Sequence, residues 1–258
     1  MNRISRAIGS ALARYLTAAQ HVHSTSRASP AEALREALQP GDVLLVEGHS
    51  RISAAIKYLT QSTWSHAALY VGPQPEGRLA QADHCFVEAD LEQGVRSIGF
   101  SEFDGFHTRI CRPVGLTPAE CETVCNAAIA RIGNQYDLRN VIDLARYLMP
   151  TPPVPARFRR RMIELGSGDP TRAICSTLIA QAFEAIGYPV LPHVDATPAP
   201  SAECPHCVAE VLRIRHHSLY APRDFDVSPY FQLIKPTLES GFDFRKLVWG
   251  EKETAATH

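Results

Sequence analysis

The sequence predicts an α+β fold in which helices pack on a small antiparallel sheet. Short apolar stretches bounded by turn residues gather in the first half of the chain, as strands do. Helical patterns precede them and resume after them, and the last strong pattern carries a cysteine in its first turn. The chain has 258 residues, of which 45% are hydrophobic and 21% charged, so it is long and apolar enough to bury a full core.

The first half is predicted to contain two short helices and four strands. One helix is expected over 31–38 and a second over 50–61, where apolar residues recur along one helical face. The strands are expected over 42–47, 64–72, 84–90 and 107–112. Alternation along the second of these strands places Trp64 and Tyr70 on the same side as His66.

The second half is predicted to be mainly helical. Thr117 and Glu120 stand at the spacing of a capping box, with Pro118 at the first helical position, so a helix is expected to run from 117 to 132. The later segments are expected to be, in order, a helix over 137–148, a loop over 150–172, a helix from Cys175 to Gly187, a loop over 188–207 and a strand or helix near 208–215.

The N-terminal segment differs from the rest of the chain. Residues 1–30 contain arginines but no acidic residue, and their helical pattern is amphipathic. Such a helix either packs on its own domain or lies on an anionic membrane surface through residues 1–20. We therefore expect an amphipathic basic helix and linker (1–30), one folded domain (31–250) and a flexible tail (251–258).

Charge and cysteine content exclude several classes of function. The net charge of −1 argues against nucleic acid as a partner, because phosphate binding usually needs a basic excess. No apolar run approaches the roughly 20 residues needed to span a bilayer. The seven cysteines are odd in number and not densely spaced, which favours reduced thiols. We expect a cytoplasmic protein, with peripheral membrane contact left open by the N-terminal helix, and no cofactor.

Cys175 is the first candidate for chemistry. It lies at the start of a helix, where the positive end of the helix dipole favours thiolate over thiol. Ser176 follows it and has a backbone N–H that no helical partner satisfies, so it is a candidate oxyanion donor. The alternative is simple packing, since Cys175 also lies on the apolar stripe of its helix and free cysteines are often buried.

His66 and Glu88 are the candidate partners of that cysteine. A histidine in a strand is more often structural than catalytic, but Glu88 lies in the following predicted strand. If the two strands are neighbours, alternation allows the imidazole and the carboxylate to share a face. The carboxylate would then hold the histidine tautomer and stabilise its protonated form, as the third member of a catalytic triad does.

Cys204 and Cys207 form a C-x-x-C pair with three open interpretations: a structural pair, half of a zinc site, or a redox pair. Zinc would need further ligands, and the sequence contains no second C-x-x-C. A redox pair would be expected where a helix follows a strand, whereas here a proline-rich loop precedes it. The structural interpretation is preferred, and no metal ligand is assigned.

The chain contains, in this order, the segments Gly-Asp-Val-Leu-Leu (41–45), Trp-Ser-His-Ala-Ala-Leu-Tyr-Val-Gly (64–72), Val-Glu-Ala (87–89) and Ile-Cys-Ser-Thr-Leu-Ile (174–179). Together they resemble the circularly permuted papain-like cysteine hydrolases, within them the YiiX/YebB-like branch of the NlpC-type superfamily. The resemblance spans about residues 38–235 and implies a permuted papain-like core. It also implies Cys175 as nucleophile, His66 as base and Glu88 as the orienting residue. The segment Gly-Asn-Gln-Tyr-Asp resembles the family's Gly-x-x-Tyr motif and implies that Tyr136 contacts the substrate or the oxyanion.

We therefore expect a cysteine peptidase or amidase that cleaves a peptide or other amide bond through a thioester acyl-enzyme. A lipid-directed acyltransferase or thioesterase would use the same triad on an acyl-lipid substrate, and the basic N-terminal helix favours it. A non-enzymatic zinc-binding or interaction module would instead rest on Cys204 and Cys207.

Overall fold

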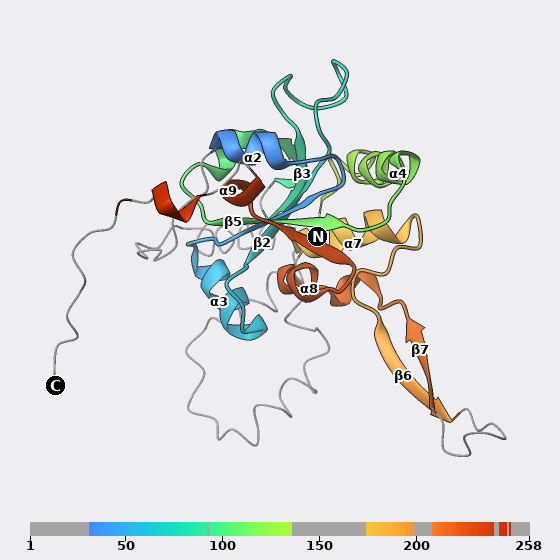
Figure 1. Ribbon diagram of the computed structural model, residues 1–258. Helices are drawn as coiled ribbons and strands as arrows, with labels where there is room; N and C mark the ends of the chain where they lie inside the picture. Colours follow the sequence, from blue (N-terminus) through green and yellow to red (C-terminus); the bar gives the residue numbers. More distant parts are fainter. Residues whose placement is uncertain are drawn as a thin grey trace, which may run out of the picture.

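Figure 1 presents a computed structural model of the chain. The structure describes residues 31–91, 93–135, 174–198, 208–239, 243–246 and 248. Several predicted features lie outside these residues, namely the N-terminal helix, the helix over 137–148, Tyr136, Cys204, Cys207 and the tail 251–258. The division of the chain into three parts therefore stays a prediction.

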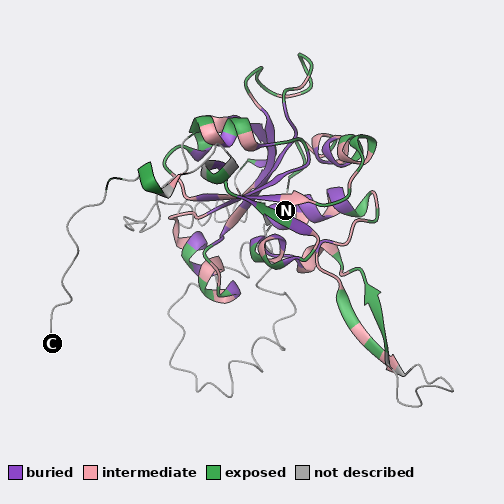
Figure 2. Ribbon diagram, viewed as in Figure 1, coloured by how far each residue is buried: buried purple, intermediate pink, exposed green. Residues whose placement is uncertain are grey.

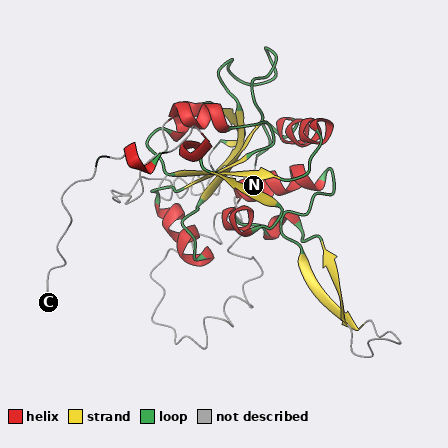
Figure 3. Ribbon diagram, in the orientation of Figure 1, coloured by secondary structure: helices red, strands yellow, loops and turns green. Residues whose placement is uncertain are grey.

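A six-stranded antiparallel sheet forms the centre of the fold (Figures 1 and 3). Its strands lie side by side in the order β4-β3-β2-β1-β5-β8. Their bounds are β1 Val43–Val46, β2 His66–Tyr70, β3 Phe86–Asp90, β4 Gly94–Ile98, β5 Thr108–Pro113 and β8 Phe231–Ile234. The central strand β1 pairs with β2 on one side and with β5 on the other. The α+β class and the antiparallel sheet predicted from the sequence are confirmed.

Apolar side chains form one core on each face of this sheet, because neighbouring residues of a strand point to opposite sides. The first core packs α4 (Pro118–Ile129), α7 (Ile174–Glu184) and α8 (Pro222–Val227) against one face. The second core lies between the other face, α2 (Ala31–Ala37) and the short 3₁₀ segment η1 (Phe100–Phe103). Figure 2 shows the strands buried between helices whose outer faces are exposed.

Side-chain caps begin two of the helices, and the cap of α4 is the one that the sequence predicts. In α3 (Arg51–Thr60), the side chain of Ser50 accepts a hydrogen bond from the N–H of Ser53. In α4, Thr117 and Glu120 form the complete predicted capping box. This helix ends at Ile129, three residues before the predicted end, and the chain continues as a turn.

The stretch 188–207, which the sequence analysis assigns to a loop, is in part a strand. Residues His193–Pro198 form β6, which pairs antiparallel with β7 (Val208–Arg213) as a two-stranded ribbon. This ribbon projects from the body of the molecule (Figures 1 and 3). Pro192 precedes this strand and Pro198 is its last paired residue, so the proline-rich composition concealed a strand whose pairing it does not interrupt.

Two strands were not predicted, and one side chain lies on the side opposite to its prediction. Strands β4 and β8 are additions at the two edges of the sheet. Trp64 lies on the opposite side from that predicted, because β2 begins only at His66 and the alternation does not extend back to the tryptophan. Its side chain is buried in the first core, and its indole N–H donates to Asp226 at 3.1 Å.

None of the helices in the described part of the chain is long and apolar enough to cross a membrane.

Candidate active site

The site forms where the ladder between β2 and β3 stops. These strands pair only at Leu69–Val87 and Tyr70–Phe86, whereas β2 continues to pair with β1 as far as His66. Continuing the β2–β3 register would match Ala67 with Ala89. The N–H of Ala67 instead forms a hydrogen bond with the sulfur of Cys175. The gap in the ladder therefore lets the start of α7 approach the beginning of β2.

The three residues expected to form a triad lie together. The Nε2 atom of His66 lies 2.7 Å from Oε2 of Glu88, and the imidazole also forms a hydrogen bond with the Cys175 thiol. Because Nε2 is engaged with the carboxylate, Nδ1 is the ring nitrogen available to the sulfur. The imidazole remains 28% exposed, whereas the Glu88 side chain is 6% exposed and Cys175 is 4% exposed. A buried thiol and a buried carboxylate thus meet at a histidine that solvent can reach.

The charges of these groups shift their pKa values in a consistent pattern. Burial favours the neutral forms, but the charges of Cys175 and Glu88, with the hydrogen bonds to both, outweigh it and hold the pKa of His66 well above 6.5. Burial likewise opposes ionisation of Cys175, yet the imidazolium, the Ala67 N–H and the Ser176 hydroxyl lower the thiol pKa below its ordinary value of 9.0. The arrangement favours a thiolate–imidazolium pair near neutral pH.

The other cysteines in the described residues behave in the opposite way. Burial raises the pKa of Cys85 to about 11 and that of Cys125 to about 12, and it also raises the pKa values of Cys111 and Cys121. None of these four has a cation and a hydrogen-bond set that overcomes the loss of solvent. Cys175 is therefore the one described cysteine with an acidic thiol.

Glu88 has a second partner that the sequence analysis did not identify. Arg96, directly opposite Glu88 in β4, donates a hydrogen bond from Nε to Oε1 at 2.9 Å, and its Nη2 lies 2.8 Å from the same oxygen as an ion-pair contact. Burial would raise the pKa of Glu88, but the charges and hydrogen bonds of His66 and Arg96 lower it overall. Only the pairing of β3 with β4 brings Arg96 here. The alternation of Val95, Arg96 and Ser97 was the one local signal.

Two other candidate residues have different positions. Ser176 is completely buried, and its Oγ lies 4.0 Å from the sulfur of Cys175. Its hydroxyl contact is therefore with the thiol, and its role toward an oxyanion stays a prediction. Tyr136 lies outside the described residues.

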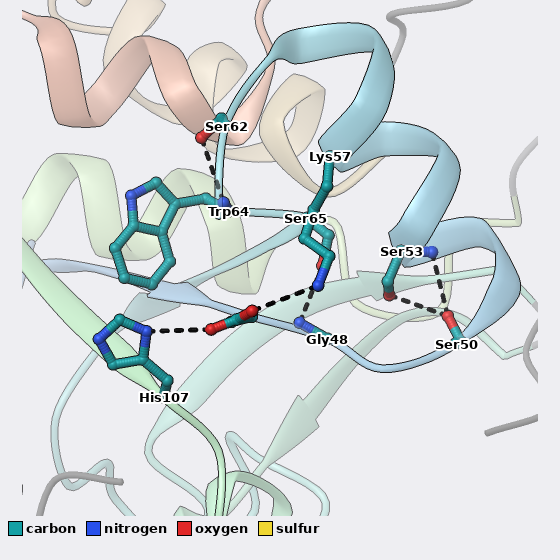
Figure 4. Close-up of polar contacts among 9 residues, drawn as sticks. Gly48, Ser50, Ser53, Lys57, Ser62, Trp64, Ser65 and His107 are labelled. Atoms are coloured by element: carbon teal, nitrogen blue, oxygen red, sulfur yellow. Dashed lines mark hydrogen bonds and ion pairs between the residues drawn. The ribbon is translucent and has the colours of Figure 1, made fainter. Parts of the chain in front are cut away.

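A second polar cluster, drawn in Figure 4, lies beyond the end of β1 at which Val46 pairs with His66. Glu47 follows β1, and its carboxylate oxygens contact Nζ of Lys57 at 3.3 Å and Nδ1 of His107 at 3.2 Å. Close by, the N–H of Gly48 donates to Oγ of Ser65 at 2.9 Å. Since Ser65 immediately precedes β2, these contacts fix the backbone from which the candidate base projects.

The described residues contain no group of three or more His, Cys, Asp or Glu side chains that could hold a metal ion. Cys204 and Cys207, on which the zinc alternative depends, lie outside that part of the chain.

The antiparallel sheet and the helix that follows it late in the chain define a permuted papain-like α+β protein. Residues 37–147 match the sequence model of the Peptidase_C92 family, described as "permuted papain-like amidase enzyme, YaeF/YiiX, C92 family", and over these residues the chain is similar to that family. The matched segment includes His66 and Glu88 and ends before Cys175.

One solved structure similar to this chain is described as "metalloprotein yiiX from Escherichia coli O157:H7". The two chains are 14% identical, the match covers 77% of this chain and 97% of the other, and the TM-score is 0.44. No curated protein matches the sequence.

Proposed function

We propose that this protein is a cysteine amidase in which Cys175 is the nucleophile, His66 the general acid and base, and Glu88 the residue that orients His66. The observation that supports this proposal most directly is the continuous hydrogen-bonded chain from the Cys175 sulfur through the imidazole to Oε2 of Glu88. A nucleophile, a base within reach of it and a third group that orients the base are the minimum set for covalent acyl transfer.

The reaction would proceed in two halves. The Cys175 thiolate attacks the carbonyl carbon of the amide, and the new C–S bond gives a tetrahedral intermediate with a negative oxygen. The imidazolium of His66 then gives its proton to the leaving nitrogen, the C–N bond breaks and the amine departs. The thioester that remains is attacked by water, whose proton His66 takes. Breaking of the C–S bond releases the acid and restores the ion pair.

The surroundings of the sulfur suit the first half of this reaction. The Ala67 N–H and the Ser176 hydroxyl both contact Cys175, so they stabilise the thiolate before substrate arrives. We place the oxyanion beside the first turn of α7, where backbone N–H groups lack helical partners. The N–H of Ser176 and the hydroxyl of Tyr136 are its proposed donors.

An amide is the proposed substrate class, because the matched family is described as one of amidases. Peptides and other acyl amides present the same reacting carbonyl, and the fold does not choose among them. Transfer of the acyl group to a lipid would use the same residues, but the feature that favours it, residues 1–20, lies outside the described part of the chain. Water is therefore our proposed acceptor.

The test uses the purified full-length protein with an electrophilic acyl probe and a panel of fluorogenic peptide and acyl amides at neutral pH. We expect acylation at Cys175 and amide turnover, both abolished in Cys175→Ala and strongly reduced in His66→Ala. Cys121→Ala is the matched control, because Cys121 is a partly exposed cysteine with a raised pKa. Labelling that is unchanged in Cys175→Ala, or turnover that survives it, would overturn the proposal.

A further inference from the structure

We propose that Arg96 is a positioning residue of this site, which keeps Glu88 ionised and aims its second oxygen at His66. The inference rests on the proposed function, since it concerns the base that serves Cys175. Arg96 does not itself reach the sulfur in the contacts described above; it acts through the carboxylate.

The two oxygens of Glu88 serve different partners. Oε1 accepts a hydrogen bond from Nε of Arg96 and has an ion-pair contact with its Nη2, and Oε2 lies against His66. With Oε1 held at two donor atoms of one planar guanidinium, the carboxylate has little freedom to rotate about its last bond. Oε2 is therefore directed toward the imidazole before any substrate binds.

A second buried carboxylate in the same chain has one arginine and one backbone N–H, that of Gln39, as its partners. Asp42 is 1% exposed and accepts hydrogen bonds from Arg112 at 2.9 Å and 2.7 Å. Burial nevertheless raises the pKa of Asp42. Glu88 is nearly as buried, yet its pKa is lowered, because it has His66 in addition to Arg96. Keeping Glu88 charged therefore depends on both cations together.

The backbone holds Arg96 in register with Glu88. On one side β4 pairs with β3, which places the two residues opposite each other. On the other side the preceding residue, Val95, donates its N–H to the carbonyl of Asn134 at 2.9 Å and accepts from the N–H of Gly133 at 2.8 Å. Arg96 thus projects from a strand that is hydrogen bonded on both edges.

The charged groups that face Glu88 set the direction of the expected effect. They are His66 from β2 and Arg96 from β4; behind them lie Cys175 from α7 and Glu102 from η1, whose Oε2 is 3.8 Å from Arg96. Removing the arginine removes one positive charge from this set. The pKa values of Glu88, His66 and Cys175 should all rise, because each proton is then held more tightly. In a plot of the Cys175 alkylation rate against pH, the acid limb, where the thiolate first forms, should then move to higher pH.

The experiment measures the rate of alkylation of Cys175 by iodoacetamide as a function of pH, with the Cys175 peptide quantified by mass spectrometry. Variants Arg96→Gln and Arg96→Lys are compared with the wild type. We expect Arg96→Gln to move the acid limb upward, by less than the roughly 1–3 units by which an adjacent arginine shifts a carboxyl pKa, because the effect reaches Cys175 through Glu88 and His66. Arg96→Lys keeps the charge but not the two donor atoms of the guanidinium, so its acid limb should move upward by less than that of Arg96→Gln.

Two control variants separate positioning from general damage. Glu102→Gln removes a carboxylate that is 51% exposed and should leave the profile unchanged. Arg112→Gln removes the arginine of the other buried carboxylate, on β5, and should lower thermal stability without moving the limb. A purely structural role for Arg96 would lower stability in the same way.

The outcomes are distinct from those of the proposed function. If the acid limb of folded Arg96→Gln coincides with that of the wild type, Arg96 is not a positioning residue, whatever the amidase assays give. If Arg96→Gln does not fold, Arg96→Lys decides: an acid limb that coincides with that of the wild type overturns the inference. If the wild-type Cys175 shows no acidic thiol at all, the proposed function fails first.

Discussion

The main-chain N–H of Ala67 forms a hydrogen bond with the sulfur of Cys175, in place of the ladder bond that β2 would otherwise make with β3. The interruption of the sheet and the location of the Cys175 thiol are therefore one feature. The residue before Ala67 is His66, so the same local backbone presents both a donor to the thiolate and the candidate base.

Replacing Glu88 with glutamine should leave the shape of the site intact and remove its negative charge. The charge of Glu88 helps to raise the pKa of His66, so that pKa should fall in Glu88→Gln and the alkaline limb of amide turnover should move to lower pH. Turnover at neutral pH should decrease by about 10²–10⁴-fold, the usual contribution of general acid–base catalysis. An unchanged alkaline limb would contradict the assigned orienting role.

The wild type should contain a thiolate at neutral pH. The lowered pKa of Cys175 and the raised pKa of His66 make the ion pair the main form in the pH interval between the two shifted values. The ultraviolet absorbance of thiolate, taken as the difference between wild type and Cys175→Ser, measures it directly. If that absorbance develops only near pH 9.0, the pair does not form.

The pair should also affect the pH dependence of folding. Wherever the ion pair persists below pH 6.5, the unfolded chain binds one proton more than the folded pair, so the contribution of the pair to stability rises with pH. Wherever it persists above pH 9.0, the folded pair binds one proton more than the unfolded chain, so the contribution falls with pH. Chemical denaturation of the wild type across this range should show the pair contributing most between the two values. A contribution that instead peaks outside this interval would be incompatible with the shifts.

Gly94→Ala should destabilise the protein more than Gly77→Ala does. Both glycines have positive φ, +75° and +83°, a region that costs an alanine about 1–2 kcal/mol. At Gly94 a Cβ would also lie 2.4 Å from the carbonyl oxygen of Asn134, whereas at Gly77 it would meet no atom within 4 Å. Thermal denaturation of the two variants gives the difference. Equal losses of stability would mean that β4 is not held against residue 134.

Thr117→Ala should lower stability without altering the site. The substitution removes the N-cap of α4, which costs about 1 kcal/mol. Because α4 packs on α7 but contributes no residue to the triad, the pH profile of Cys175 alkylation should stay in place while the unfolding midpoint falls. A shifted profile would indicate that α4 controls the geometry of Cys175.

Local patterns in the sequence determined much of the fold. The capping box at Thr117, the apolar stripe of α7 and the alternation of β2 and β3 depend on residues within a few positions of one another, and the structure contains each of them. The shared face of His66 and Glu88 followed from the same alternation. The order of these segments also carried the resemblance to the permuted papain-like family.

Only the tertiary structure decided which distant residues meet. The hydrogen bond of Cys175 with His66 joins positions more than a hundred residues apart, and it depends on where the β2–β3 ladder ends. Arg96 reached Glu88 through a strand that local composition did not reveal, and Trp64 changed sides because β2 begins two residues after it. Periodicity is a property of neighbouring residues, whereas strand pairing and its termination are set by packing across the whole sheet. For that reason the sequence alone could nominate the three residues of the site, and the fold decided which of them meet and what supports them.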